Sequence, residues 1–314
     1  MTAAKGKPDR RVFDEIAALA TEQRNPRTMD LDTKDVEGIL AAIHAEDRTV
    51  AGVVGGEIPH IAQVVELAVA AITAGGRIVY VGAGTSGRLG VLDAAECPPT
   101  FGTPPTLVRG IIAGGPRALT QAVEGAEDRE AEGRAALRRA RVGPRDLVVG
   151  LAASRRTPFV QAALAYAIER GARTALICCT PRSEITPGVD VVISLVVGPE
   201  ALMGSTRMKA GTAQKLTLNM ISTATMVRLG KVYENMMVDL MATSRKLVER
   251  GRRTLMTVTG LGYEEACETL ERAGGSVKTA IVMAKAGVSR AEAEKRLRKA
   301  NGFVRVALAA VEGS

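Results

Sequence analysis

Aromatic residues and histidines are the scarcest side chains in this 314-residue chain, which has four tyrosines, four phenylalanines, two histidines and no tryptophan. So few aromatic faces argue against the base-stacking platforms that bind single-stranded nucleic acid. The two histidines, His44 and His60, lie outside the predicted sheet region. We therefore expect neither a Ser-His-Asp triad nor a histidine-based metal site, and we predict no metal ion.

Cysteines are also few, and none of the four forms the Cys-x-x-Cys spacing of metal and redox sites. Cys178 and Cys179 lie in an apolar run typical of a strand, which favours free thiols in a reducing compartment. The N-terminus has no hydrophobic signal core, and no apolar run reaches the length needed to span a membrane. We therefore expect a cytoplasmic protein with no membrane partner.

The overall composition favours a folded protein that attracts anions. Hydrophobic residues make up 46% of the chain, enough for a sizeable core, and the length suits about two domains. The formal net charge is +8, but the excess is spread over helical surface runs and accompanies no zinc-finger or RNA-binding motif. The charge therefore predicts attraction for anionic small molecules and no nucleic-acid partner.

Strands and helices alternate through the middle of the sequence, which predicts βαβ units and a parallel sheet. Two amphipathic helices, 35–45 and 58–72, precede the first strand. The predicted strands are 77–81, 106–112, 146–151, 173–178 and 191–196, and the helices among and after them are 87–96, 117–123, 129–141, 158–170 and 208–229.

The strand pattern ends after residue 235, and short helices are predicted from there to the C-terminus. These are 239–252, 263–273, 277–284, 290–299 and 302–311. We predict a flexible N-terminal tail (1–20), a sheet-bearing domain with its N-terminal helices (21–253) and a small all-helical domain (254–314). The fold class is therefore α/β, a parallel sheet flanked by helices with a small C-terminal helical domain.

A glycine-rich loop follows the first strand, with Gly82, Gly84 and Gly87 set around Thr85 and Ser86. A strand–loop–helix turn of this kind points backbone N–H groups and the positive helix end at one spot, which suits a phosphate. No Lys-Ser or Lys-Thr pair follows the glycines, so the loop is not an ATP-binding P-loop, and the dinucleotide pattern fits only weakly. A plain tight turn with a helix cap remains the alternative.

Two further polar loops are predicted at the carboxyl edge of the same sheet. Ser154 and Thr157 lie just before Pro158, which suits the first position of a helix. Ser205 precedes the long predicted helix 208–229, and Lys209 lies near its start, where it could meet an anion or be a surface charge. Ordinary helix capping would explain the hydroxyls, but ligands of such sheets bind at this edge.

Carboxylates gather in two places among small or apolar residues. Asp93 and Glu96 lie just before Pro98-Pro99, and the second group contains Glu124 and Glu127. A carboxyl surrounded by apolar groups has a raised pKa and can act as a general acid near neutral pH, and a pair can divide acid and base roles. Acidic residues at helix ends are also often simply solvated.

The sequence resembles the N-acetylmuramic acid 6-phosphate etherases, enzymes of the sugar isomerase (SIS) type that are related to the glucokinase regulatory protein. The resemblance covers nearly everything after the first dozen residues. The words that carry it are Thr21-Glu-Gln-Arg-Asn-Pro26, Glu46-Asp-Arg-Thr-Val50, Gly82-Ala-Gly-Thr-Ser-Gly-Arg88, Leu92-Asp-Ala-Ala-Glu-Cys-Pro-Pro-Thr100, Ala122-Val-Glu-Gly-Ala-Glu-Asp128, Gly204–Lys215 and Lys278-Thr-Ala-Ile-Val-Met283.

The resemblance implies a lyase that cleaves the D-lactyl ether of N-acetylmuramic acid 6-phosphate by elimination and hydration. Glu96 would protonate the departing lactate oxygen, and Glu127 would be the second acid/base residue. Lys209 and Glu124 are further candidates for substrate contact. The resemblance also implies a homodimer, no cofactor, and a role in amino sugar recycling. The phosphate would be held by Gly84, Thr85, Ser86, Ser154, Thr157 and Ser205.

Two features of the sequence depart from what the resemblance implies: the residue at position 155 and the distance from Ser86 to Glu96. Family members are expected to have glycine where this chain has Arg155, and a glycine lost from a phosphate loop changes which backbone conformations are allowed. Ten residues of helix from Ser86 to Glu96 would also span about 15 Å, more than the reach of one hexose phosphate. Our hypothesis is that Glu96 serves the site of a partner subunit, or that the helix starts late or bends.

Two other functions fit the same phosphate loops. An aldose–ketose phosphate isomerase would need no acid at Glu96 to protonate lactate. A non-catalytic sugar-phosphate sensor would keep Ser86 and Ser154 without turnover. Release of D-lactate from N-acetylmuramic acid 6-phosphate would separate the etherase from both.

Overall fold

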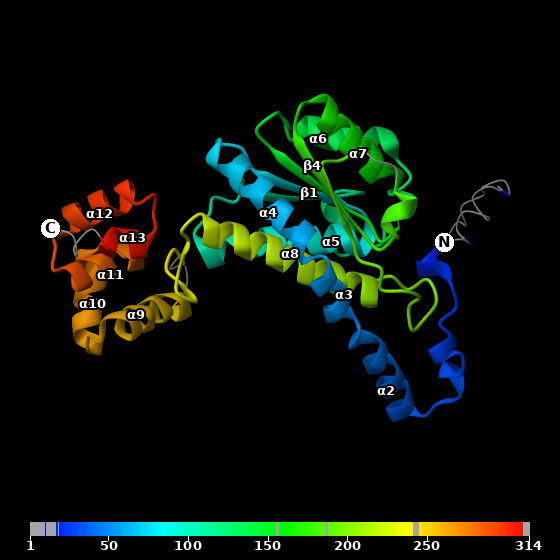
Figure 1. Cartoon of the computed structure of the whole chain (residues 1–314), viewed down its shortest axis with the longest axis horizontal. Coiled ribbons are helices and arrows are strands. Elements are labelled where there is room, and N and C mark those ends of the chain that lie inside the picture. Colours follow the sequence, from blue (N-terminus) through cyan, green and yellow to red (C-terminus); the bar gives the residue numbers. More distant parts are fainter. Residues whose placement is uncertain are drawn as a thin grey trace.

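The fold is built on a five-stranded parallel sheet with strand order β2-β1-β3-β4-β5. The structure is a computed structural model, and it describes residues 10, 17, 19–154, 157–185, 188–240 and 245–309 (Figure 1). The predicted α/β fold class, with all five predicted strands, is confirmed. The strands are β1 (Ile78–Gly82), β2 (Val108–Ile112), β3 (Leu147–Leu151), β4 (Arg173–Cys178) and β5 (Val191–Ser194).

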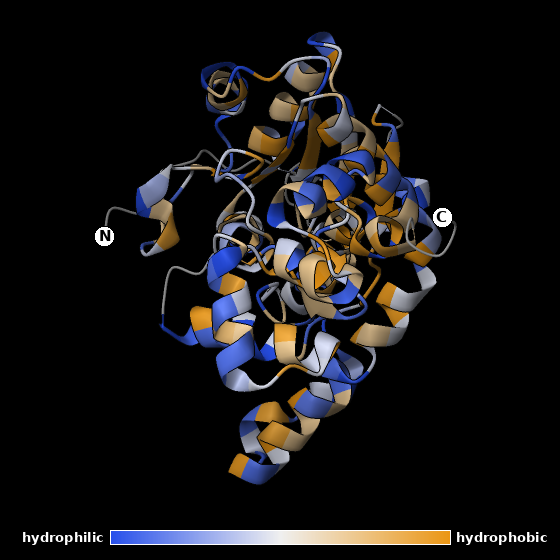
Figure 2. Ribbon diagram, turned by 90° about the vertical axis from the view of Figure 1, so that its left-hand side faces the viewer, coloured by the Kyte–Doolittle hydropathy of each residue, from blue (hydrophilic) through white to orange (hydrophobic). Residues whose placement is uncertain are grey.

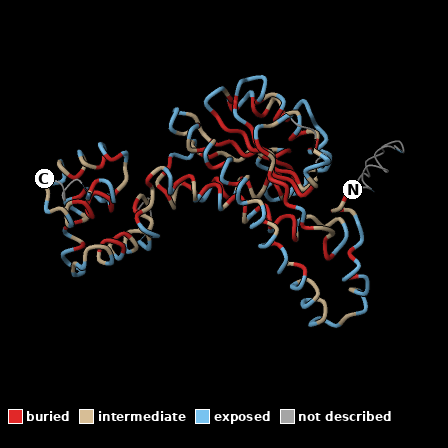
Figure 3. The backbone as a smooth tube through the Cα atoms, viewed as in Figure 1, coloured by how far each residue is buried: buried red, intermediate tan, exposed pale blue. Residues whose placement is uncertain are grey.

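Helices cover both faces of the sheet because successive strand residues point to opposite sides. Ile78 and Tyr80 of β1 belong to one apolar core, and Val79 and Val81 belong to the other. All four side chains are fully buried, as the continuous run of buried residues through the sheet shows (Figure 3). The first core includes residues of α3 (Val50–Gly56), α4 (Ile58–Thr73), α5 (Gly84–Phe101) and α8 (Lys209–Arg228); the second includes residues of α6 (Glu130–Arg139) and α7 (Pro158–Glu169).

The helix after β1 is longer than the sequence predicted. It begins at Gly84 instead of residue 87, and it continues through Pro98 and Pro99 to Phe101. These prolines lie in the last turn, where each removes a single hydrogen bond to an earlier carbonyl, and Gly102 then ends the helix with φ +63°. A second correction concerns residues 117–123, which form the short 3-10 helix η4 (Pro116–Leu119) instead of an α-helix.

From residue 19 onward, the described N-terminal part has three 3-10 turns followed by two helices that lead to α4. These elements are η1 (Ala20–Glu22), η2 (Pro26–Thr28), η3 (Leu31–Thr33), α2 (Val36–Asp47) and α3. Figure 1 shows α2 extending away from the sheet. Among the described residues no single helix is long and apolar enough to cross a membrane; only the pair 36–56 and 58–73, bent by 59°, meets the criteria of length and composition.

The C-terminal helices form an apolar core of their own, separate from the two cores of the sheet. It lies beside the sheet-bearing part (Figure 1). Their outer surfaces mix hydrophilic and hydrophobic residues, as expected of small amphipathic helices (Figure 2). A two-stranded hairpin precedes them, so the predicted end of strand structure at residue 235 is corrected by β7. The elements are β6 (Val232–Tyr233), β7 (Met236–Met237), α9 (Arg245–Thr259), α10 (Tyr263–Arg272), α11 (Val277–Ala286), α12 (Arg290–Lys299) and α13 (Val304–Ala309).

The predicted domain boundary at residue 253 lies within a helix. Helix α9 already begins at Arg245, and Gly251 packs closely against Val277 of α11. Residues 239 and 240 are not helical, and residues 241–244 of the predicted helix 239–252 lie outside the described residues. Most of the predicted tail 1–20 also lies outside them, although Leu19 is buried.

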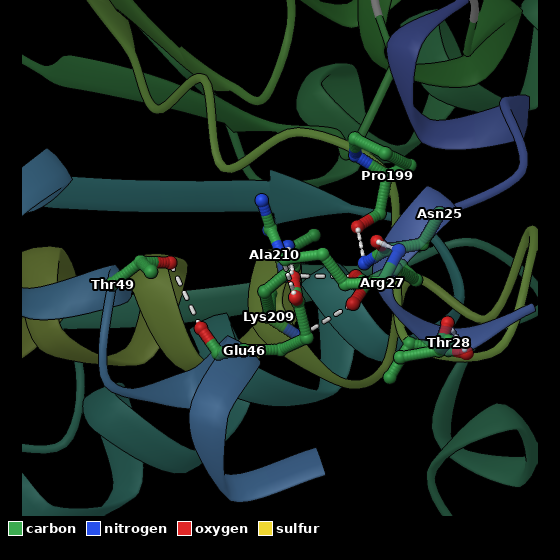
Figure 4. Close-up of polar contacts among 10 residues, drawn as sticks. Asn25, Arg27, Thr28, Glu46, Thr49, Pro199, Lys209 and Ala210 are labelled. Atoms are coloured by element: carbon green, nitrogen blue, oxygen red, sulfur yellow. Dashed lines mark hydrogen bonds and ion pairs between the residues drawn. The ribbon is translucent and has the colours of Figure 1, made fainter. Parts of the chain in front are cut away.

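A buried ion-pair network joins the N-terminal part to the start of α8 (Figure 4). The Lys209 ammonium donates to the Glu46 carboxylate at 2.6 Å, and both side chains are almost fully buried. Arg27 donates to the same carboxylate from the solvent side. The hydrogen bonds from Arg27 lower the pKa of Glu46 to about 2, against the opposing effect of burial. Glu200, also buried, accepts from the backbone N–H groups of Lys209 and Ala210.

Replacing Glu46 by glutamine should destabilise the fold, because the Lys209 ammonium would stay buried without its counter-charge. We expect a loss of about 3–5 kcal/mol in the free energy of unfolding at neutral pH. The double variant Glu46→Gln/Lys209→Met removes both buried charges and should recover much of this loss. Urea unfolding followed by circular dichroism measures both, and a single variant as stable as the wild type would contradict the prediction.

The same pair predicts how stability depends on acid. The pKa of Glu46 is lowered in the folded state, so its contribution is complete above the ordinary value of 4.5 and is lost as the pH falls toward 2. As the pH falls between these values, the difference in the free energy of unfolding between the wild type and Glu46→Gln should therefore become smaller. Unfolding curves across that range would show the two stabilities converging.

Candidate active site

The candidate site lies where the chain changes direction across the sheet. Strand β1 has β2 on one side and β3 on the other, so the loops after β1 and β3 leave their strands in opposite directions. Such a switch point opens a crevice at the carboxyl ends of the strands. A cavity of about 400 Å³ occupies it. Its lining residues are Leu19, Thr21, Glu22, Ala83, Gly84, Thr85, Ser86, Glu127, Asp128, Ala152, Ala153, Ser154, Thr157, Gly204 and Thr206.

A larger cavity, about 620 Å³, runs along the edge strand β2, but its chemistry is different. Its described lining has apolar residues and arginines such as Arg109 and Arg129, without a serine or threonine hydroxyl. The smaller cavity combines hydroxyls, backbone N–H groups and carboxylates, which is the set needed to hold and protonate a sugar phosphate. The smaller cavity is therefore the candidate active site.

The first wall is the start of α5, held tightly against the end of β1. A Cβ atom at Gly87 would lie 2.8 Å from the backbone of Gly82, so glycine is required for this close approach. The N-cap residue Ala83 gives no side-chain cap, and the first-turn N–H groups have no acceptor within the helix. Ser86 is buried beside them, and Thr85 is half-buried. This wall therefore presents donors and the positive helix end to the cavity.

The second wall is the loop between β3 and α7. Thr157 is buried at the N-cap of α7 and makes no side-chain cap, and Pro158 occupies the first helical position as predicted. Ser154 lines the same cavity. The structure therefore brings Thr85, Ser86, Ser154 and Thr157 to one cavity. Arg155, the residue expected to be glycine, lies outside the described residues.

The third wall is the segment before α8, where two details differ from the sequence prediction. Gly204 and Thr206 line the cavity, while Ser205 between them does not. Helix α8 is capped by the carboxylate of Glu200, not by a hydroxyl of its own loop. The ammonium of Lys209 donates to the Glu46 carboxylate and lies outside the cavity lining.

Glu127 is the carboxylate of the predicted pair that reaches the cavity. Its backbone carbonyl accepts the N–H of Phe159 in the first turn of α7, which fixes its loop beside Thr157. Partial burial raises the pKa of Glu127, and the nearby charges of Asp128 and Glu124 raise it further. A carboxyl with a raised pKa is suited to proton transfer near neutral pH.

The other predicted carboxylates lie elsewhere in this chain. Glu96 is exposed on α5 and Glu124 is exposed in its loop, and neither lines the cavity. The continuous helix from Gly84 excludes a late start as the way to bring Glu96 closer. Asp93 is buried against α8 and accepts hydrogen bonds from Asn219 and Ser222, so its role is in packing.

Sequence reasoning missed the wall supplied by the N-terminal segment. Leu19, Thr21 and Glu22 line the cavity, and Thr21 is buried. These residues precede the first strand by more than fifty positions, so no local pattern links them to the phosphate loops. The one available signal was the polar word Thr21–Pro26, which carried part of the family resemblance without an assigned role.

Comparison with known proteins decides the family. The chain is 56% identical to an N-acetylmuramic acid 6-phosphate etherase of Salinibacter ruber, covering 95% of this chain and 96% of that protein. It is 54% identical to the etherase of Serratia proteamaculans, covering 93% of this chain and 99% of that protein. The chain belongs to the N-acetylmuramic acid 6-phosphate etherase family. These etherases are carbon–oxygen lyases, and the predicted family is confirmed.

Two family profiles match parts of this chain. The profile of the glucokinase regulatory protein N-terminal SIS domain matches residues 60–168, and the SIS domain profile matches residues 129–224. The solved structure of E. coli CFT073 c3406, determined as a complex with its ligand, is 15% identical and aligns with a TM-score of 0.47. That alignment covers 64% of this chain and 97% of the other.

The cavity predicts which hydroxyls matter for binding. Replacing Ser86 by alanine should weaken binding of N-acetylglucosamine 6-phosphate by about 1–3 kcal/mol, the cost of one hydrogen bond to a charged group. Ser205→Ala is the matched control, because Ser205 lies outside the cavity lining, and its affinity should stay near the wild-type value. Isothermal titration calorimetry measures both, and equal losses in the two variants would refute the placement of the phosphate.

Proposed function

We propose that this chain cleaves the D-lactyl ether of N-acetylmuramic acid 6-phosphate with water, giving N-acetylglucosamine 6-phosphate and D-lactate in amino sugar recycling. One observation carries this proposal: an etherase-family chain gathers two uncapped helix starts, their hydroxyls and a carboxyl of raised pKa around a single cavity. The four cysteines are free, which supports the reducing cytoplasm as the place of this reaction.

The phosphate end of the substrate binds where the helix starts meet. The unpaired N–H groups at the start of α5 and the hydroxyls of Thr85, Ser86 and Thr157 supply donors for a dianion. Ser154 lines the same region. The chain's own groups supply the acid and the base, so the proposed reaction needs no bound cofactor.

The reaction then proceeds on the open-chain sugar in two stages. Glu127 takes the proton from carbon 2, the bond from carbon 3 to the lactyl oxygen breaks, and a double bond forms between carbons 2 and 3. Glu96 gives its proton to the departing oxygen, so D-lactate leaves with the lactyl oxygen protonated. Water then adds across the double bond, with its oxygen on carbon 3 and its hydrogen on carbon 2.

We infer that Glu96 of the partner subunit completes each site in a homodimer. Within one chain the ten residues from Ser86 to Glu96 span about 15 Å along α5, and Glu96 is exposed and does not line the cavity. In a dimer with a two-fold axis, a residue that is too far from the site of its own chain can reach the site of the other chain. The exposed position of Glu96 supports this arrangement.

Lactate release tests the reaction and both acids. Glu96→Gln and Glu127→Gln should each abolish D-lactate release while retaining binding of N-acetylglucosamine 6-phosphate, because glutamine keeps the shape and loses the proton. An enzymatic assay for D-lactate, with calorimetry for binding, measures the two properties. Full turnover in either variant would show that its acid is wrongly assigned.

Mixing the two inactive variants tests whether Glu96 acts across the dimer. A mixed dimer of Glu96→Gln with Glu127→Gln would contain one complete site, assembled from Glu127 of one chain and Glu96 of the other. Unfolding and refolding an equal mixture should restore about a quarter of wild-type lactate release, since roughly half the dimers are mixed and each has one complete site. No recovery would assign both glutamates to one chain.

The neighbours of Glu127 predict the pH profile. The charge of Glu124 helps to raise the pKa of Glu127, so Glu124→Gln should lower that pKa. If Glu127 acts as the base, the acidic limb of kcat/KM moves to lower pH in this variant. Glu130→Gln, outside the cavity, is the control. An unmoved limb in Glu124→Gln would contradict the assignment of Glu127 as the titrating base.

A further inference from the structure

Glu22 is a third carboxylate at the edge of the substrate cavity, and the mechanism above does not use it. It belongs to η1 and lines the cavity together with Gly204 and Thr206. Its Oε2 atom lies 3.1 Å from the point where a Cβ atom on Gly204 would stand, so the carboxylate rests directly on the third wall. This puts it beside the segment that faces the start of α5.

The carboxylate of Glu22 has no partner among the described residues. The hydrogen bonds and ion pairs of the described parts of the chain leave both of its oxygens unused, although the side chain is partly buried. Its neighbour Glu46, by contrast, is held by two cations. A carboxylate in a polar cavity without a cation is placed to accept hydrogen bonds from a ligand.

The backbone that carries Glu22 is fixed firmly to the third wall (Figure 4). The Asn25 amide donates to the carbonyl of Pro199 at 3.1 Å, and the Thr28 hydroxyl donates to that of Ala201 at 2.8 Å. The Lys209–Glu46 pair joins the start of α8 to the same N-terminal part. The N-terminal segment and the segment before α8 are therefore held together, which keeps Glu22 at a defined position in the cavity.

The chemistry of the cavity limits what Glu22 can bind. A phosphate dianion belongs on the helix starts, because a carboxylate in contact with it would repel it. The substrate's lactyl carboxylate is excluded from Glu22 for the same reason. The neutral donors that remain are the sugar hydroxyls and the amide N–H.

We propose that Glu22 is a specificity-determining residue, whose carboxylate accepts a hydrogen bond from a hydroxyl or amide N–H of the sugar and keeps anionic groups away from that wall. The proposal rests on the proposed function for the identity of the sugar. Glu22 would contact the neutral part of the sugar on one side of the cavity, and this contact would set the orientation of the bound substrate.

The affinities for a sugar phosphate and for inorganic phosphate distinguish this role of Glu22 from a structural one. Glu22→Gln should bind N-acetylglucosamine 6-phosphate about tenfold more weakly, because a hydrogen bond to a charged acceptor is replaced by a weaker one. The same variant should bind inorganic phosphate as well as the wild type or better, because a repelling charge is removed. Isothermal titration calorimetry with both ligands measures the two affinities, and thermal melting checks that the variant is folded.

Matched variants complete the test. Glu37→Gln changes an exposed glutamate outside the cavity lining and should leave both affinities unchanged. Glu22→Asp keeps the charge and should bind inorganic phosphate no better than the wild type does. Parallel weakening of both ligands in Glu22→Gln, or no weakening of the sugar phosphate, would overturn the proposal.

The outcome is separable from the etherase reaction. If wild-type protein releases no D-lactate but Glu22→Gln still weakens the sugar phosphate alone, the etherase proposal fails and the role of Glu22 stands. If the wild type releases D-lactate but the variant weakens both ligands equally, the etherase proposal stands and the role of Glu22 is refuted.

Discussion

The site depends on one electrostatic constraint: two helices begin at neighbouring strand ends without side chains to cap them. The first turn of α5 leaves N–H groups without acceptors, whereas the Phe159 N–H in the first turn of α7 donates to the carbonyl of Glu127. Because β1 and β3 are adjacent, the donors of α5 and the hydroxyl of Thr157 line one cavity. The close packing of Gly82 on Gly87 holds the first helix in place, so the cradle is formed by backbone before any ligand arrives.

A second buried interaction builds the opposite side of the cavity from distant parts of the chain. Lys209 and Glu46 pair in the interior, while Glu200 takes up the first N–H groups of α8. The first N–H groups of α8 are therefore satisfied internally, unlike those of α5, which line the cavity. A buried pair of this kind fixes one arrangement of its segments, because breaking either partner leaves a charge without solvent.

The carboxylates of the cavity have different environments, and this supports different duties. Glu127 lies where partial burial and two acidic neighbours favour its protonated form. Glu22 rests on Gly204, with the first helix start nearby. Glu96 is solvated in the single chain, and its distance along α5 supports a role that only a second copy completes. Acid, base and orienting groups would thus come from three separate segments.

The sequence by itself determined the parallel sheet, the two hydroxyl-bearing loops that line the cavity, and the family. Runs of β-branched residues and glycine–hydroxyl loops are local signals, and the order of strands and helices leaves few arrangements. Only the tertiary structure decided that Thr206 and Glu22 line the cavity while Ser205 does not. It also decided that Lys209 forms a buried ion pair with Glu46. The reason is physical: these placements depend on contacts between distant segments, which no local pattern encodes. Asn25 and Pro199, for example, are 174 residues apart.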